Sequence, residues 1–150
     1  MPLSRSLFPT TLASFILAVV GCATTAPPQP ATPAPTSFAD QVAIGGKLFG
    51  EKCASCHGDA GQGGKGPRLV GIKEGALPLD PPPERKFRKT QFVTVADVAT
   101  FAVANMPPGK AGSLDADQYW AIVAFDLHAN GIDLPDLLTP TVASTLNIPR

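Results

Sequence analysis

Two cysteines and a histidine stand close together near the middle of the chain, in the order Cys53-Ala54-Ser55-Cys56-His57. Two thiols at this spacing can each form a thioether bond to a vinyl group of one haem, while the histidine that follows turns its imidazole toward the iron. This pattern is a haem-attachment motif. It predicts one covalently bound haem c, held by Cys53 and Cys56, with His57 as the first axial ligand.

The same residues allow two other kinds of site. A structural zinc ion takes four ligands in a tetrahedron, and beyond residue 22 the chain offers only Cys53, Cys56, His57 and the distant His128. A thioredoxin-like dithiol belongs beside a strand–helix–strand pattern, and the sequence shows none around Cys53. Haem attachment therefore accounts for these residues better than zinc binding or dithiol chemistry.

An iron that only passes electrons needs a ligand on its second face, and methionine sulfur or a second histidine is the usual donor. Beyond Met1 the one methionine is Met106, which stands before Pro107 and Pro108. Pro107 disfavours the helical region for Met106, so a preceding helix ends there and the side chain is free to point away. A single methionine otherwise fills gaps in a core. We predict Met106 as the second axial ligand and His128, the rival, as a cation in a helix's last turn.

Over roughly residues 37 to 131 the chain resembles the class I c-type cytochrome family in the order and spacing of these motifs. The segment from Asn105 to Gly109 is similar to that family's methionine strap. The sequence Gly66-Pro67-Arg68-Leu69-Val70-Gly71 is similar to a family motif whose proline carbonyl accepts the second ring N–H of the ligating histidine. The resemblance implies this role for Pro67, packing on the porphyrin for Leu69, and an all-α fold around one haem.

Between the two motifs, Gly61, Gly63 and Gly66 match the spacing G-x-G-x-x-G. A nucleotide site needs that motif after a strand and at the start of a helix, whereas this run follows a helical turn and ends in Gly66-Pro67. We interpret these glycines as positions where the backbone curls closely around a flat cofactor.

Three helices are predicted to position the motifs. A first helix over 38–52 follows Ser37, which together with Asp40 three residues later resembles a capping box. A second opens at Thr94 and ends at the methionine strap. A third, predicted to be the longest, opens at Ser113 and ends before Gly131.

The family resemblance also implies that the first and last helices cross beside the haem, a small residue of one meeting an aromatic residue of the other. Gly45 or Gly46 against Trp120 or Phe125 fits that arrangement. These aromatic residues are equally compatible with an ordinary hydrophobic core.

The N-terminal 22 residues are typical of a secretion signal, with Arg5 followed by an apolar run over 12–20 that is too short to span a bilayer. The ending Gly21-Cys22 resembles a bacterial lipobox, which implies cleavage and acylation of Cys22. Residues 23–36, rich in Pro, Ala and Thr, predict an extended tether. We expect a protein at the outer face of the cytoplasmic membrane or in the periplasm, anchored in a membrane by lipid. Ala23 after the lipid cysteine mildly favours the outer membrane.

The composition and the remaining segments limit which partners the protein can bind. A net charge of zero argues against nucleic acid, which needs a Lys/Arg excess on one surface, and the length suits one domain. Residues 72–93 are an addition to a minimal cytochrome of the family, and their basic cluster suits either docking of an acidic redox partner or a solvated face. Residues 132–150 are a second addition, in which Thr139-Pro140 predicts a short helix. The basic residues of the first addition are Arg85, Lys86, Arg88 and Lys89.

Ligation by His57 and Met106 would leave the iron no open position, which predicts a one-electron carrier rather than an enzyme. Two alternatives stay open. If Met106 is only core, the chain is a haem sensor or haem enzyme subunit with a vacant or labile sixth position. It could equally be a relay subunit of a larger dehydrogenase or oxidase.

Overall fold

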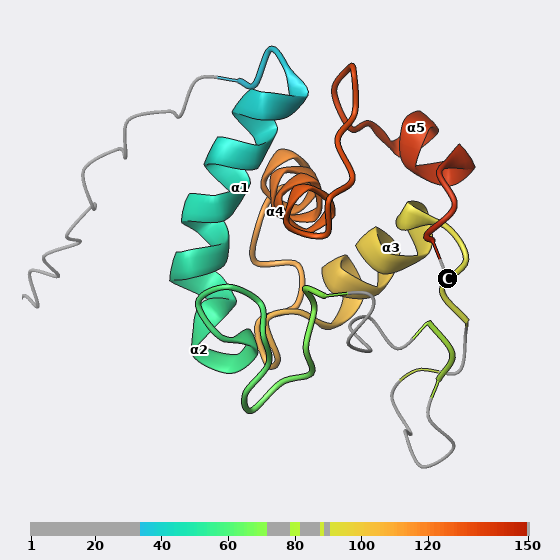
Figure 1. Ribbon diagram of the computed structural model, residues 1–150. Helices are drawn as coiled ribbons and strands as arrows, with labels where there is room; N and C mark the ends of the chain where they lie inside the picture. The colour runs from blue at the N-terminus through green and yellow to red at the C-terminus, as the bar shows by residue number, and fades with distance from the viewer. Residues whose placement is uncertain (1–33, 72–78, 82–87, 89–90, 150) are drawn as a thin grey trace, which may run out of the picture. The chain divides into compact units, whose positions relative to one another are not determined.

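The computed structural model describes residues 34–71, 79–81, 88 and 91–149 (Figure 1). These residues form helices and loops, with no strand among them beyond an isolated bridge between Thr94 and Asn147. The all-α prediction is therefore confirmed. In order, the helices are α1 (Phe38–Lys52), α2 (Ala54–His57), α3 (Val95–Asn105), α4 (Ala116–Ala129) and α5 (Pro140–Thr145).

The predicted signal sequence, Cys22 and the tether up to residue 33 lie outside the described residues. Within the described part, no helix has the length and apolar character that crossing a membrane takes. Thr36, assigned to the tether, donates hydrogen bonds from its backbone and its hydroxyl to the carboxylate of Asp40. The folded unit thus begins before Ser37, because the first turn of α1 uses Thr36 as well.

The helix starts follow the sequence signals at α1, α3 and α5 but not at α4. Ser37, Thr94 and Thr139 cap their helices. The prediction of Ser113 for α4 was wrong, because the N-cap is Asp115, whose side chain accepts from the Gln118 N–H while the Gln118 side chain accepts from the Asp115 N–H. Such a reciprocal pair satisfies two N–H groups at the helix end. α4 is also not the longest helix, with 14 residues against 15 in α1.

Helices α1 and α4 cross at close quarters, as predicted (Figure 1). A Cβ on Gly45 would lie 1.8 Å from the carbonyl oxygen of Ala121, so only glycine fits there. A Cβ on Gly46 would lie 3.2 Å from the ring of Phe125, so Gly46 and Phe125 form the expected small-to-aromatic contact. Phe125 also packs on Phe49, with ring centroids 5.0 Å apart.

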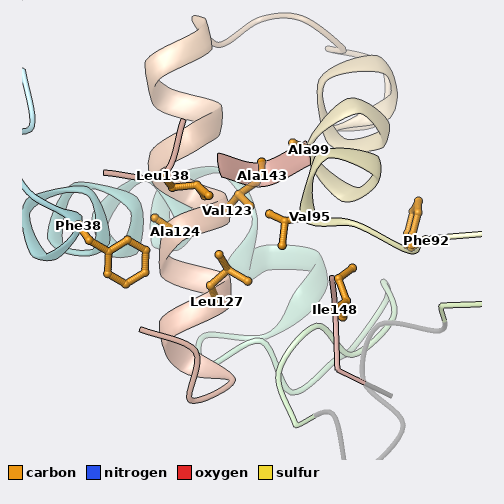
Figure 2. Close-up of a cluster of buried hydrophobic side chains, with 10 residues drawn as sticks. All are labelled: Phe38, Phe92, Val95, Ala99, Val123, Ala124, Leu127, Leu138, Ala143 and Ile148. Carbon is orange, nitrogen blue, oxygen red and sulfur yellow. The ribbon is translucent and has the colours of Figure 1, made fainter. Parts of the chain in front are cut away.

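The main core lies where α4 meets α3 and the C-terminal tail (Figure 2). Its buried side chains come from α1, α3, α4, α5 and the segments beside α3 and α5, and they are Phe38, Phe92, Val95, Ala99, Val123, Ala124, Leu127, Leu138, Ala143 and Ile148. The tail therefore contributes to the core. Burying this much apolar surface is the main term that holds the helices together.

Arg88, part of the predicted basic docking cluster, does not present its charge to a partner. Its guanidinium donates to the backbone carbonyls of Leu79 and Asp80 and lies over the ring of Phe92, 3.9 Å from the ring centroid. The residue is 7% exposed. Docking through Arg88 was thus a wrong expectation, because the charge is used inside the fold. Arg85, Lys86 and Lys89 lie outside the described residues.

Candidate functional site

Cys53, the first cysteine of the attachment motif, joins α1 to α2, and Cys56 and His57 lie within the single turn of α2. The backbone N–H of Cys53 donates to the Phe49 carbonyl, and the N–H groups of Cys56 and His57 both donate to the Cys53 carbonyl. Helical hydrogen bonding thus holds both thiols and the imidazole on one compact turn. Both thiols are free and partly buried.

The chemistry of the Cys53 thiol does not suit a reactive dithiol. Burial, together with the nearby Asp126 carboxylate and the Cys56 thiol, raises the pKa of Cys53 to about 11. Redox-active dithiols need a lowered pKa, because the thiolate is the nucleophile. A buried, neutral thiol is instead suited to a permanent covalent bond.

His57 is buried and oriented. Its Nδ1 lies 2.8 Å from the backbone carbonyl oxygen of Pro67, and the residue is 8% exposed. This is the hydrogen bond predicted for Pro67. Because it places the ring proton on Nδ1, Nε2 keeps its lone pair for a metal.

Gly66 lets the loop pass the imidazole at close range. A Cβ at this position would lie 2.8 Å from Cε1 of His57. The loop is held to the attachment turn by backbone bonds from Gly66 to Cys56 and from Gly63 to His57. The run of glycines thus wraps the histidine and is neither preceded by a strand nor followed by a helix in the described residues, which agrees with rejecting a nucleotide site.

Leu69 follows the Pro67 carbonyl and packs against the smaller core cluster of Phe49, Ala54 and Ile122. Its backbone is fixed by Asn130, near the end of α4. The Asn130 side chain donates to the Leu69 carbonyl and accepts from the Gly71 N–H. Asn130 could not be predicted from the sequence, because Leu69 and Gly71 are about sixty residues away along the chain.

Met106 stands directly after α3, in an extended conformation with φ −121° and ψ 144°. This is the helix end that Pro107 predicts. Tyr119 of α4, which is buried, donates its hydroxyl hydrogen to the Met106 carbonyl at 2.6 Å and accepts from the Gly112 N–H at 3.2 Å. Sequence reasoning missed Tyr119, which fixes the strap at Met106, and the segment just after it at Gly112, to α4.

His128, the rival axial ligand, is exposed on the last turn of α4. Its Nδ1 lies 2.6 Å from the Asp133 carboxylate. His128 thus lies in the last turn of α4, as predicted.

α3, α4 and the tail line a small, almost wholly apolar cavity of about 20 Å³. Asp126 and Asn130 are its polar members, and its apolar lining consists of Val95, Val98, Val123, Leu127, Ile132 and Ile148. Oδ1 of Asp126 is buried and has no hydrogen-bond partner among the described residues. Burial raises the pKa of Asp126 to about 7. A carboxyl group in such a place favours its neutral form.

Together these features fit a covalently bound haem. Two free thiols, an imidazole with an available Nε2 and a thioether at a helix end supply the anchors and ligands that the cofactor needs. Among the described residues, no group of three or more His, Cys, Asp or Glu gathers as a metal site would require.

Comparison with known families agrees with this chemistry. Residues 40–125 match the family described as cytochrome c oxidase, cbb3-type, subunit III. The chain belongs to this family of c-type cytochromes. Its fold is accordingly cytochrome c-like, and its cofactor is covalently bound haem c.

Two relatives of this cytochrome take part in sulfur chemistry. It is 33% identical over 123 residues to a thiosulfate dehydrogenase of Stutzerimonas stutzeri (strain A1501), a match covering 77% of this chain and 36% of that protein. It is 31% identical to a chain of the sulfane dehydrogenase SoxCD from Paracoccus pantotrophus, with a TM-score of 0.50, covering 72% of this chain and 53% of that one. The cytochrome thus spans about a third of the first relative and about half of the second.

Proposed function

We propose that this cytochrome is a monohaem one-electron carrier in which Cys53 and Cys56 form the thioether bonds and His57 and Met106 are the axial ligands. The observation that carries the proposal is the hydrogen bond from His57 to the Pro67 carbonyl, which orients a buried imidazole with Nε2 available. Bound haem supplies an iron that alternates between the ferric and ferrous states. With both axial positions filled, electrons enter and leave by outer-sphere transfer.

The chain's own residues set the conditions for that transfer. The Pro67 carbonyl fixes the tautomer and orientation of His57, and Tyr119 holds the backbone of Met106. A pre-fixed strap loses less entropy when its thioether is held at a metal. The apolar lining around Val95, Leu127 and Ile148 excludes water, which together with a thioether ligand favours ferrous iron.

The anchoring and compartment are part of the same proposal. The Arg5 segment and apolar run of a secretion signal, followed by Gly21-Cys22, support lipid attachment at Cys22 outside the cytoplasmic membrane. Each buried methylene of an acyl chain contributes about 0.8 kcal/mol, so stable attachment takes more than one chain. Residues 23–36 would then act as a spacer between lipid and haem domain.

A second candidate is an electron-accepting subunit of a sulfur-oxidising dehydrogenase. It is favoured by the two relatives, one a thiosulfate dehydrogenase and the other part of a sulfane dehydrogenase. In that case the haem relays electrons taken from an inorganic sulfur compound oxidised on a partner subunit. In both candidate functions, the haem would exchange electrons with partner proteins.

Spectroscopy of the purified protein tests the carrier proposal. We expect one haem per chain that stays with the protein in acidified organic solvent. The ferric form should show a weak sulfur-to-iron charge-transfer absorption, and the ferrous form should bind carbon monoxide slowly or not at all. Met106→Ala should abolish that absorption and open the iron to carbon monoxide. The exposed Val103→Ala on the same helix is the matched control and should change neither.

Four outcomes would contradict parts of the proposal. A colourless protein would refute haem attachment. Charge-transfer absorption that persists in Met106→Ala would refute the assigned ligand, and rapid carbon monoxide binding to the native ferrous protein would favour a sensor or enzyme. Reduction of the haem by thiosulfate without any added protein would favour a dehydrogenase of its own. Cys22→Ser tests the anchor, since it should move the protein from the membrane fraction to the soluble fraction.

A further inference from the structure

Asp126 is a buried acid that the proposed function does not use. It lies on α4, and its Oδ1 is buried without a hydrogen-bond partner among the described residues. Buried polar atoms are nearly always hydrogen-bonded, so an unpaired one calls for an explanation. The apolar residues that surround it in the cavity cannot provide a partner.

Asp126 lies near the residue that would anchor the haem. Its carboxylate is near enough to Cys53 to raise the pKa of that thiol, and Cys53 packs against the cluster that contains Ile122, one turn before Asp126 on α4, so a haem bonded to Cys53 would lie near Asp126. Asn130, one turn further along α4, shares the cavity and donates to the Leu69 carbonyl of the loop that carries Pro67. The cavity around Asp126 therefore adjoins both the attachment turn and the loop behind His57.

Among the residues that line this cavity, Asp126 is the one with a titratable side chain. From α1 it faces Cys53, which no longer titrates once it is a thioether. α3 contributes Val95 and Val98, and the tail contributes Ile132 and Ile148. On its own helix, the Asn130 amide is neutral. The ring N–H of His57, on α2, is directed at Pro67.

We propose that Asp126 takes up a proton when the haem iron is reduced and releases it when the iron is oxidised, so that electron transfer is coupled to proton transfer. The proposal rests on the carrier function. Its balance is one electron from the redox partner and one proton from water: ferric iron with the Asp126 carboxylate becomes ferrous iron with the Asp126 carboxylic acid. The carboxyl O–H bond forms as an O–H bond of a hydronium ion in the solvent breaks, and no other bond changes.

The sign follows from charge. Ferric haem carries one more positive charge than ferrous haem, and an opposite charge favours ionisation of a nearby carboxyl. Burial already raises the pKa of Asp126 to about 7, so the loss of that charge on reduction makes proton uptake occur close to neutral pH. In a cavity that excludes water, this effect is screened less than at the surface. The midpoint potential should therefore fall as pH rises through this range.

A redox titration of the holoprotein at a series of pH values tests the proposal. We expect an acid plateau, a sloping region near neutral pH and a lower alkaline plateau. A roughly tenfold difference in proton affinity between the two oxidation states corresponds to about 59 mV between the plateaus. Asp126→Asn should keep the potential near the wild-type acid plateau throughout, because its side chain is always neutral. Asp126→Leu, which matches the apolar lining, should also lose the slope.

The matched control is His128→Gln, since His128 is a second titratable group on α4 but is exposed and paired with Asp133. It should keep the full slope. A second readout is the reduced-minus-oxidised infrared difference spectrum, in which the carboxylic acid C=O band should appear in wild type and be missing in Asp126→Asn. Loss of the slope and of the infrared band in both Asp126 variants, with both retained in His128→Gln, would support the proposal.

An unchanged slope in both Asp126 variants, or its loss in His128→Gln, would overturn the proposal. So would a wild-type potential that does not vary with pH. These failures are distinct from failure of the carrier function, because haem content, charge-transfer absorption and carbon monoxide binding are recorded on the same samples.

Discussion

Tyr119 ties the proposed iron ligand to the helix bundle through one hydroxyl group. It donates to the Met106 carbonyl and accepts from the Gly112 N–H. In Tyr119→Phe the ring still fills its buried site, but a backbone carbonyl and an N–H lose their partner. We expect a loss of about 1–2 kcal/mol, as for other buried groups left unpaired.

This loss should act on the ligand rather than on haem attachment. We expect Tyr119→Phe to weaken the charge-transfer absorption and to raise the affinity of ferric iron for an added ligand such as imidazole roughly tenfold, since 1.4 kcal/mol is a factor of ten. Titration with imidazole measures this. Tyr119→Phe with unchanged imidazole affinity would show that the hydrogen bonds do not hold the strap.

The buried carboxyl of Asp126 also makes stability depend on pH. Because its pKa in the folded protein, about 7, lies above the ordinary value of 3.8, its contribution is fully present below about pH 4 and is lost as pH rises through 7. At about 1.4 kcal/mol per pKa unit, the loss is at most about 4 kcal/mol. Asp126→Asn should remove this decline.

Denaturant unfolding of wild type and Asp126→Asn between about pH 4 and pH 8 measures the difference. The pKa values of Asp40 and Asp97 are lowered by hydrogen bonds with Thr36 and Thr94, and these contributions cancel because both proteins contain them. A difference between the two proteins that stays constant with pH would show that Asp126 does not titrate in the folded state.

The contacts of a residue could be predicted from the sequence where its partners are close along the chain, and could not where its partners are distant. His57 and Pro67 are ten residues apart within one motif, so their hydrogen bond could be predicted. Tyr119, Asp126 and Asn130 resemble any residues of an amphipathic helix until α4 is packed against the strap and the attachment turn. Arg88 was misjudged for the same reason, because its partners become visible only in the folded chain.

The crossing of α1 and α4 depends on glycine at one position. A Cβ on Gly45 would lie 1.8 Å from the Ala121 carbonyl oxygen and 2.4 Å from its carbon, both backbone atoms that cannot turn aside. Gly45→Ala must therefore push the two helices apart and disturb the contacts around Phe49. We expect it to cost more than about 3 kcal/mol, the upper range for overpacking a core.

Gly50, one turn further along α1, provides the matched control. A Cβ there meets no atom within 4 Å. Because alanine favours helix over glycine, Gly50→Ala should stabilise the protein by about 0.5–1 kcal/mol. Chemical denaturation of the two variants decides the point, and similar effects from both would mean that the helices do not cross as closely as described.

Element boundaries were predictable where one cap competed with no other. Thr94 directly follows Phe92 and Val93, which cannot cap a helix through a side-chain oxygen, whereas Ser113 and Asp115 both offer oxygen atoms near the start of α4. Asp115 is the cap because Gln118 completes the reciprocal pair. The backbone N–H of Ser113 instead donates to the Lys110 carbonyl, in a turn that follows the strap.

At the scale of the whole molecule, the added C-terminal tail is part of the folded core. Leu138, Ala143 and Ile148 are buried in the main cluster (Figure 2). The tail also pairs with the segment before α3, where the N–H of Ile148 donates to the Val93 carbonyl. Ile132 and Ile148 line the cavity beside Asp126, so the tail forms one side of that cavity.

The buried side chain of Gln41 bonds the tail to α1. Its amide nitrogen donates to the Leu138 carbonyl at 3.0 Å, and its amide oxygen accepts from the Leu138 N–H at 2.7 Å.

Gln41→Met keeps the length of the side chain but leaves both backbone groups unpaired, which we expect to cost about 2–4 kcal/mol. Gln62→Met, at an exposed glutamine that bonds locally to the Ala60 N–H, should cost less than about 0.5 kcal/mol. Denaturation of both holoproteins gives the free energies of unfolding. Since the tail lines the cavity, Gln41→Met should also speed exchange of the backbone N–H groups of 138–148, and equal losses in the two variants would mean that the tail is held by apolar contacts alone.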